Sequence, residues 1–442
     1  MVSNLNQIKG APLKTQDYAP AWLGWTMWGL VAALYMIGFF QRMAPAVMVN
    51  ELMREFSLGG ALMGNLAATY FYAYAAMQIP SGLLADAIGP RLLSTAACTI
   101  AAAGILIFGL ATNLYMAYAG RLLIGGSVAV AFVTCMKLAG HWFPTNRFAT
   151  VTGVSLLLGN AGGVLAGVPL AHAVTAIGWR HAMLITAVVT FGTAVAIWMI
   201  VRNDPAEKGY LSHAHAGVVA RGSLPPAKAL KLVAGRRDTW FLFLAGGLSA
   251  SPVLVFAGLW GVPFLTQVHG LERAQAAAMT STMLVAWAIG GPLAGALSDR
   301  LGKRRLPYLL VNSIAAILWG IFLVVPLPSG MLYLLFAAIG LSSGGVIIGF
   351  AHAREANHPG ASGAVAGLVN MGVLGLASIM QPLLGGILDR HWDGTLIAAA
   401  RVYNAQAYSA AFFWFFASAV LSVLMASLTR ETHCRMQAYS EN

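Results

Sequence analysis

Two arginines and a lysine interrupt segments that are otherwise apolar, and they are the first candidates for chemistry. Arg42 stands in GFFQRMAPA, Arg121 in GRLLIGG, and Lys137 follows 16 residues after Arg121. A guanidinium group is planar and permanently charged, so it binds a carboxylate or a phosphate through paired hydrogen bonds. Lys137 lies about 160° around a helix from Arg121 and does not share its face. The pattern predicts Arg42 and Arg121 as anion ligands and Lys137 as a structural or gating residue.

The composition indicates that a lipid bilayer surrounds this chain. Of its 442 residues, 59% are hydrophobic and 9% are charged, and the mean hydropathy is +0.74. Soluble domains average roughly 25% charged residues, so this chain lacks the polar surface to cover itself in water. Cys98, Cys135 and Cys434 form neither a paired framework nor a metal-binding spacing, so we expect no disulfide and no metal. We also expect no cofactor.

Twelve apolar segments are long enough to cross the bilayer as helices of about 20 residues. They fall near 22–49, 60–85, 92–111, 115–141, 148–174, 181–201, 240–268, 276–298, 306–326, 330–352, 363–388 and 408–429. A polar stretch at 202–239 separates the sixth segment from the seventh. The sequence therefore predicts an all-α membrane protein with two six-helix bundles, at 22–201 and 240–429. Polar tails at 1–21 and 430–442 flank them, and the first tail is too long to be part of a signal peptide.

Two charged turns repeat at a constant offset. SGLLADAIGPRLL begins at Ser81, and AGALSDRLGKRR begins at Ala294. Four pairs of positions are each 213 residues apart: Gly82 and Gly295, Asp86 and Asp299, Gly89 and Gly302, and Arg91 and Arg304. The offset pairs the second helix with the eighth, as a duplication of six helices would. We therefore expect two bundles related by pseudo-twofold symmetry.

The distribution of Lys and Arg predicts the orientation. If both termini are cytoplasmic, the tails and the loops on that side hold 18 of the 26 basic residues. The outer loops then hold five, namely Arg54, Arg180, Arg273, Arg390 and Arg401. Cytoplasmic loops carry an excess of Lys and Arg, so this arrangement is favoured. The net charge of +12 follows from topology, and no soluble basic face points to nucleic-acid binding.

The apolar segments offer no acidic partner for the cations, because no Asp or Glu lies in the central part of any of them. Buried charges in a membrane are costly and usually face a water-filled path. We infer that the missing negative charge arrives with a ligand. The alternatives are that Arg42 reaches the outer surface and that Arg121 anchors an interface.

Polar aromatic side chains complete a candidate cavity. Tyr70, Tyr74 and Gln78 recur every four residues and form one stripe on a helix. The segment at 240–268 is broken by glycines and a proline, so Trp260 lines the cavity or an outer gate. The alternative for the tyrosines is hydrogen bonding between packed helices. The candidate substrate-binding residues are Arg42, Arg121, Tyr70, Tyr74, Gln78, Trp260, Gln41 and Asn370.

These motifs resemble those of the major facilitator superfamily. Both loops resemble its signature G-x-x-x-D-R-x-G-R-R/K, and GRLLIGG, WFPTNRF and GWRHAM are further matches. The first loop departs from the signature at Ala87 and Pro90. The resemblance covers all twelve segments and is nearest the organic-anion and sugar-phosphate permease branch. It implies that Arg42 binds or couples substrate and that Arg121 is the arginine of helix 4. In that branch an Asp often precedes the first arginine, and here Gln41 stands in its place.

The repeated loops predict a conformational latch. A carboxylate at the end of helix 2 or 8 can face the N-terminus of a helix in its own half and accept a bond from the loop arginine. The latch would hold the halves in the outward-facing state. Its predicted residues are Gly82, Asp86, Gly89, Arg91, Gly295, Asp299, Arg300, Gly302, Lys303 and Arg304. The alternative is a basic loop that only fixes topology. We also expect His352, Arg354 and Glu355 to form an ion-pair cluster.

The expected function is secondary active transport of a small organic anion across the plasma membrane by a monomer, with protons as a candidate coupling ion. Gly159, Gly163 and Gly167 lie at four-residue spacing, but Val164 stands where an antiporter signature has Pro, which favours uptake. An exporter of drug-like compounds or siderophores and a non-transporting sensor are the alternatives. An enzyme is not expected, since no nucleophile–base pair, phosphate loop or metal spacing is present.

Overall fold

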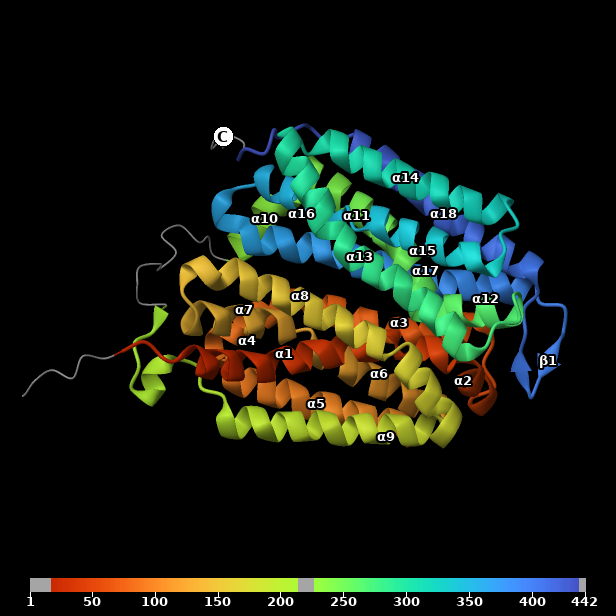
Figure 1. Cartoon of the computed structure of the whole chain (residues 1–442), viewed down its shortest axis with the longest axis horizontal. Coiled ribbons are helices and arrows are strands. Elements are labelled where there is room, and N and C mark those ends of the chain that lie inside the picture. Colours follow the sequence, from red (N-terminus) through yellow and green to blue (C-terminus); the bar gives the residue numbers. More distant parts are fainter. Residues whose placement is uncertain (1–16, 214–225, 437–442) are drawn as a thin grey trace, which may run out of the picture.

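The computed structural model describes residues 17–213 and 226–436, and in these residues two bundles of long helices lie side by side (Figure 1). The predictions for residues 1–16, 214–225 and 437–442 lie outside the described residues. Between the bundles the chain forms η3 (Pro205–Lys208) and α10 (Pro226–Ala234). The two six-helix bundles that the sequence predicts are present.

The N-terminal half begins with α1 and ends with α9. Its elements are α1 (Ala21–Met43), η1 (Ala44–Val47), α2 (Val49–Glu55), α3 (Gly60–Ala76), α4 (Gln78–Ile88), α5 (Pro90–Gly109), α6 (Leu114–Val128), α7 (Ala131–Trp142), η2 (Thr145–Arg147), α8 (Phe148–Leu165) and α9 (Val168–Ile200). Local sequence explains the boundaries. Asn113 caps α6 by accepting a hydrogen bond from Met116 N at 3.0 Å. Gly178, with φ of 77°, forms the kink at which the fifth span turns into the sixth within α9.

The C-terminal half repeats this plan. Its elements are α11 (Arg237–Val255), η5 (Phe256–Trp260), α12 (Gly261–Gln267), α13 (Arg273–Leu301), α14 (Arg305–Val324), α15 (Ser329–Ser343), α16 (Val346–Glu355), η6 (Pro359–Ala361), α17 (Ser362–Arg390), β1 (Leu396–Ile397), β2 (Ala400–Arg401) and α18 (Ala405–Ser427). The segment η5 is a π-helix between α11 and α12, and such bulges often lie at functional sites.

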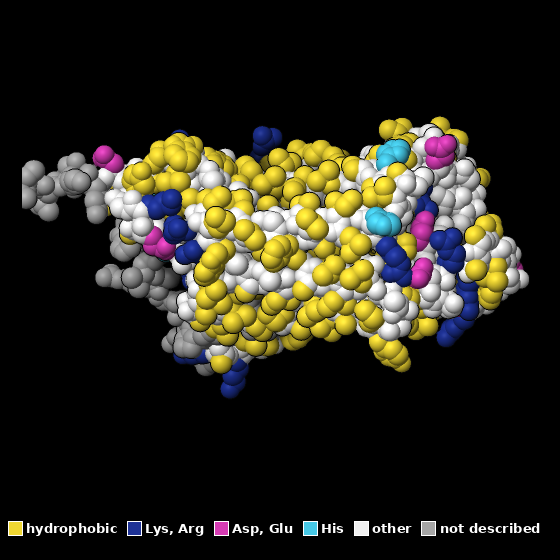
Figure 2. Space-filling view, turned by 90° about the horizontal axis from the view of Figure 1, so that it is seen from below, with side chains coloured by type: hydrophobic (Ala, Val, Ile, Leu, Met, Phe, Trp, Pro, Cys, Tyr) yellow, Lys and Arg dark blue, Asp and Glu magenta, His cyan; other side chains and the backbone are white. Residues whose placement is uncertain are grey.

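Twelve spans are present in the described residues, although ten continuous stretches meet the criteria of length and apolar character. One of these stretches, Thr150–Ile200, contains two spans that join at Gly178. The second span is divided at Met77 into α3, with 17 residues, and α4, with 11 residues. Neither part alone is long enough to be one of the ten stretches. On the face drawn in Figure 2, hydrophobic side chains cover the middle of the molecule and most charged groups gather toward its two ends, as a bilayer requires.

The two ends of the bundles differ in how the halves meet. We call the end that carries η3 and α10 the linker end, and the end that carries β1 and β2 the far end (Figure 1). Helix α3 packs along α17 across the interface between halves. At the far end their backbones touch, because a Cβ placed on Gly385 would lie 2.0 Å from the carbonyl oxygen of Gly60. Only glycine permits this approach, and it closes the far end.

Candidate functional site

Arg42 ends α1 inside the N-terminal half, and its surroundings are aromatic. Its guanidinium carbon lies 4.4 Å from the ring centre of Phe39, 5.1 Å from that of Tyr74 and 5.7 Å from that of Tyr70. Only 6% of the residue is exposed, and Nε has no hydrogen-bond partner. Among the described residues, no carboxylate lies within ion-pair distance of this guanidinium. Arg42 is therefore a buried cation that cation–π contacts compensate only in part.

Arg121 lies on α6 and is near the same tyrosine. Its guanidinium carbon is 5.2 Å from the ring centre of Tyr70. It donates hydrogen bonds to the carbonyl oxygens of Gln41 at 2.7 Å and Ala67 at 3.2 Å. These bonds tie α6 to α1 and α3, and they use carbonyl dipoles in place of a carboxylate. Arg42 and Arg121 thus share Tyr70 and bring two positive charges into one buried region of the membrane.

The tyrosines and amides differ in the contacts they make. The Tyr70 hydroxyl donates to the carbonyl oxygen of Gly38 at 2.9 Å, so part of its polar capacity joins α3 to α1. Tyr74 stacks on Tyr70 with ring centres 6.0 Å apart. Asn370 on α17 donates to the side-chain oxygen of Gln78 on α4 at 3.0 Å. This amide pair joins the two halves.

Two predicted ligands lie elsewhere. The side chain of Gln41 donates to the hydroxyl of Thr186 at 3.4 Å, and its carbonyl is the group that meets Arg121. Trp260 donates from its indole to the carbonyl oxygen of Gln381 at 3.3 Å and meets the ring of Tyr403 at 6.5 Å. Both partners of Trp260 belong to the C-terminal half, toward the far end. The structure therefore does not bring these two side chains to the arginine pair.

The first loop motif is held differently from the prediction. The Asp86 carboxylate is paired with Lys137 Nζ at 2.9 Å, and Lys137 also donates to the carbonyl oxygen of Ala85 at 2.7 Å. Arg91 does not reach Asp86, because it lies in the first turn of α5 beside α9. Its guanidinium donates to the carbonyl oxygen of Trp198. The prediction of an Arg91–Asp86 bond is wrong, and Lys137 is the structural partner instead.

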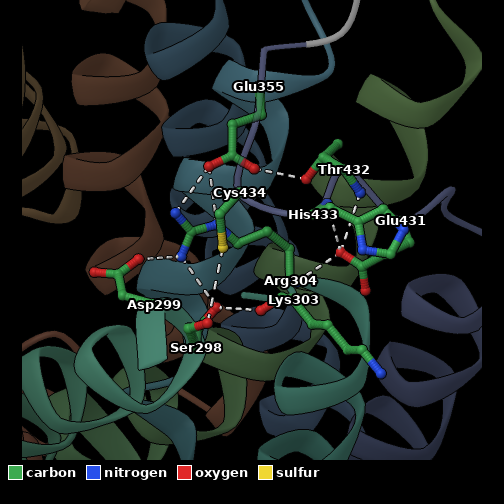
Figure 3. Close-up of polar contacts among 9 residues, drawn as sticks. All are labelled: Ser298, Asp299, Lys303, Arg304, Glu355, Glu431, Thr432, His433 and Cys434. Carbon is green, nitrogen blue, oxygen red and sulfur yellow. Dashed lines mark hydrogen bonds and ion pairs between the residues drawn. The ribbon is translucent and has the colours of Figure 1, made fainter. Parts of the chain in front are cut away.

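The second loop motif forms a larger cluster (Figure 3). Arg304 Nη1 lies 2.6 Å from the Asp299 carboxylate, as expected, and Arg304 Nε and Nη2 lie 2.9 and 2.8 Å from Glu355. Glu355 therefore pairs with Arg304 and not with Arg354. His352 instead donates to the carbonyl oxygen of Arg430 at 2.6 Å. The expected cluster of His352, Arg354 and Glu355 is thus replaced by one centred on Arg304.

The four glycines of the loop motifs differ in their surroundings. Gly89 and Gly302 have positive φ angles of 78° and 60°, and they end α4 and α13 in tight turns. Gly82 and Gly295 do not lie at a close helix contact, because a Cβ at either position would meet no atom of a neighbouring element within 4 Å in the described residues. The halves do not press together at these glycines in this conformation. Arg300 and Lys303 are exposed.

The sequence reasoning missed Asp389, which closes the far end. Its two carboxylate oxygens accept hydrogen bonds from Gly60 N at 2.7 Å and Ala61 N at 2.9 Å, across the interface between halves. These are the first N–H groups of α3, where an anion is stabilised by the helix dipole. Arg401 and Tyr403 hold the same carboxylate at 3.0 and 2.7 Å. The signal that could have revealed Asp389 is a pair of glycines, 385–386, that precedes it as small residues precede Asp299.

A sequence model described as the Major Facilitator Superfamily matches residues 31–382. The chain belongs to this superfamily. The predicted resemblance is confirmed, and so is the fold of two pseudo-symmetric bundles. Superfamily members of known structure share this architecture. A bacterial homologue of the human lysosomal transporter Spinster, solved in an inward-facing and unoccupied conformation, superposes with a TM-score of 0.71 and 17% identity over 92% of this chain and 95% of that one.

Relatives of known sequence include carriers named for anions. A probable sulfoacetate transporter of Cupriavidus necator is 24% identical over 287 residues, which are 62% of this chain and 65% of that relative. A probable galactarate/D-glucarate transporter of Escherichia coli K12 is 23% identical over 64% of this chain and 68% of its own length. A probable hexose phosphate transport protein of Chlamydia muridarum is 24% identical over 82% of this chain and 85% of its own length. The match to the first relative thus spans just under two thirds of that protein.

Proposed function

We propose that this superfamily member is a secondary active transporter of a small organic anion. The observation that carries the proposal is the pair Arg42 and Arg121, buried around Tyr70 with no carboxylate within ion-pair distance among the described residues. An uncompensated charge in a membrane protein costs several kcal/mol by typical estimates. A carboxylate, sulfonate or phosphate that binds there supplies the missing charge. The names of the sulfoacetate, galactarate/glucarate and hexose phosphate relatives support this substrate class.

Arg42 is the better ligand of the two arginines. The Nε of both arginines is buried without a partner, but Arg121 also donates from Nη1 and Nη2 to two backbone carbonyls, which fixes its guanidinium group. Tyr74, beside Arg42, is a second polar group for the ligand. The amide pair of Gln78 and Asn370 extends this polar surface to the C-terminal half, so a bound anion can be sensed by both halves.

The direction we propose is uptake at the plasma membrane, by a monomer whose termini are cytoplasmic. The excess of Lys and Arg at the linker end supports this orientation. On this orientation the closed far end faces outward, as it does in an inward-facing state. Alternating access then requires the far end to open and the linker end to close. Asp86 and Asp299, whose side chains are 80% and 66% exposed, are the groups we propose to latch the closed linker end.

Uptake into proteoliposomes tests the proposal. Radiolabelled sugar acids, sulfoacetate and sugar phosphates are supplied outside, each with and without an inward pH gradient. We expect saturable uptake of at least one of these anions and none of a labelled organic cation. An increase with the pH gradient identifies protons as the coupling ion. Uptake of the cation in preference to every anion contradicts the proposal.

The latch predicts a specific defect. Asp299→Asn removes the charge that the latch needs, and we expect the initial rate of anion uptake to fall at least tenfold. The amount of protein inserted in the membrane stays unchanged, because Arg300, Lys303 and Arg305 still fix the topology of the loop. Uptake assays normalised to the reconstituted protein check the prediction. An unchanged rate of anion uptake in Asp299→Asn would mean that the second loop motif only fixes the topology of the chain.

A further inference from the structure

The chain that follows the last helix folds back onto the second loop motif. We call residues 429–435 the C-terminal strap (Figure 3). Glu431 accepts hydrogen bonds from Arg304 N at 2.7 Å and Arg305 N at 3.0 Å, so it caps the N-terminus of α14. Thr432 donates to Glu355 at 2.6 Å, on the carboxylate oxygen that Arg304 does not use. The strap therefore holds the backbone of Arg304 and the partner of its guanidinium.

The N-terminal half contains the same arrangement in different residues. The chain after α9, residues 202–212, is the linker strap. Asn203 accepts a hydrogen bond from Arg91 N at 2.8 Å, at the first turn of α5. Asp204 lies 2.8 Å from His141 near the end of α7, as Thr432 lies near the end of α16. Arg91 and Arg304 are equivalent positions of the repeat, so each half caps the helix after its loop motif with the segment that follows its sixth helix.

The contacts of the C-terminal strap join residues within one half. Such contacts are the same whether the halves tilt one way or the other, and by themselves they do not shift the equilibrium between the two states. They act on that equilibrium only through a group that touches the other half. Arg304 Nη1 binds the exposed carboxylate of Asp299 at 2.6 Å, so the strap, Arg304 and Asp299 form one connected chain.

The charge of Glu431 suits this role. Burial works to raise the pKa of its carboxyl, but the backbone N–H groups of Arg304, His433 and Arg305 outweigh burial and lower the pKa below its ordinary value. The group is therefore ionised at neutral pH and binds the helix N-terminus as a full anion. Asn203 makes the corresponding contact without a charge.

We propose that Glu431 is a positioning residue for the latch: it holds Arg304, and through Arg304 it orients Asp299 toward the other half. The inference rests on the latch of the proposed function. It assigns a transport role to the chain beyond the last span. Loss of Glu431 lets Asp299 move away from its binding geometry, and the closed linker end becomes less stable.

A single cysteine at the far end reports the equilibrium without any substrate. Ala46 is 4% exposed in η1, which packs against η5 of the other half, so Ala46→Cys is shielded while the far end is closed. Its rate of alkylation by a water-soluble maleimide scales with the fraction of time the far end is open. Cys98 and Cys135 are buried, and Cys434→Ser removes the remaining thiol. In this background we compare Glu431→Ala, Glu431→Gln, Asp299→Asn and the double variant Glu431→Ala/Asp299→Asn.

We expect Glu431→Ala to slow alkylation about tenfold, because a charge-assisted contact is lost. We expect Glu431→Gln, which keeps one acceptor, to slow it less. Asp299→Asn should slow it by a similar factor, and the double variant no further, because the two residues act through one contact. Arg435→Ala is the matched control, since the side chain of this exposed strap residue makes no hydrogen bond or ion pair with any described residue, and its loss should leave the rate unchanged.

Three results overturn the inference. In the first, Glu431→Ala lowers the melting temperature but alkylates at the rate of Arg435→Ala, which means that the strap is only structural. In the second, the effects of Glu431→Ala and Asp299→Asn multiply, which means that they act independently. In the third, Asp299→Asn is alkylated at the same rate as the parent, which means that Asp299 does not stabilise the closed linker end. Anion uptake is measured separately, so failure of the transport proposal appears as a parent without uptake.

Discussion

Arg42→Lys is expected to raise the dissociation constant of the transported anion at least tenfold. Lysine keeps the positive charge but loses the planar fork that binds a carboxylate or phosphate through two bonds. One lost charge-assisted hydrogen bond is worth roughly 1.5–3 kcal/mol, which corresponds to tenfold or more in affinity. Lysine would also lose the contacts that the guanidinium group makes with the rings of Phe39 and Tyr74, and this loss acts in the same direction. Binding of the labelled anion to purified protein measures the effect.

Arg180→Lys is the matched control for this substitution. Arg180 also carries a guanidinium near an aromatic ring, 4.5 Å from the ring centre of Trp179, but it pairs with Glu55 within the N-terminal half at the far end. Its replacement should leave the affinity unchanged. If Arg42→Lys binds the anion as tightly as the parent, the fork of Arg42 is not a ligand.

Asp389→Asn is expected to open the far end. In the structure one carboxylate accepts two N–H groups of α3 and is held by Arg401 and Tyr403. An amide offers one acceptor oxygen and no charge, so the contact with the helix N-terminus of the other half is weakened. Alkylation of Ala46→Cys should become at least tenfold faster, and the rate-limiting step of transport should change.

Asp393→Asn provides the comparison for Asp389→Asn. Asp393 is an exposed carboxylate at the same end, and its bonds to Thr395 and Asn404 stay within the C-terminal half. Its replacement should not change the alkylation rate. Equal rates for Asp389→Asn and the parent would show that the glycine contacts alone close the far end.

The spans and the repeat could be predicted from the sequence because both depend on local composition. Long apolar segments must form helices in a bilayer, where every backbone N–H and C=O needs a partner. The equivalence of Asp86 and Asp299 can be read directly from the sequence, because the two loop motifs repeat at a constant offset. The break at Met77 also has a local cause, because Pro80 has no N–H to bond to the carbonyl of Ala76, where α3 ends.

Partners across the fold could not be predicted, because they depend on how helices tilt and meet. Lys137 lies 51 residues from Asp86, and Glu355 lies 51 residues from Arg304. Asp389 contacts the N-terminus of α3, 329 residues earlier in the chain, across the interface between the halves. Arg42 and Arg121 could be selected because a charge within an apolar segment is visible in the sequence. Their common neighbour Tyr70 was identified from its helical spacing with Tyr74 and Gln78. The directions of the Gln41 and Trp260 side chains depend on how each helix is rotated about its axis, which residue spacing does not determine.

Thermal unfolding of the purified protein with matched pairs of ligands tests the central claim most directly. Each pair differs only in the anionic group, as a sugar acid differs from its sugar alcohol and a sugar phosphate from its sugar. A ligand that binds the folded state raises the melting temperature in proportion to its affinity. We predict that at least one anion stabilises the parent, that its neutral counterpart does not, and that Arg42→Gln abolishes the difference. Equal stabilisation by the neutral counterpart, or an undiminished anion effect in Arg42→Gln, would contradict anion recognition by the buried arginines.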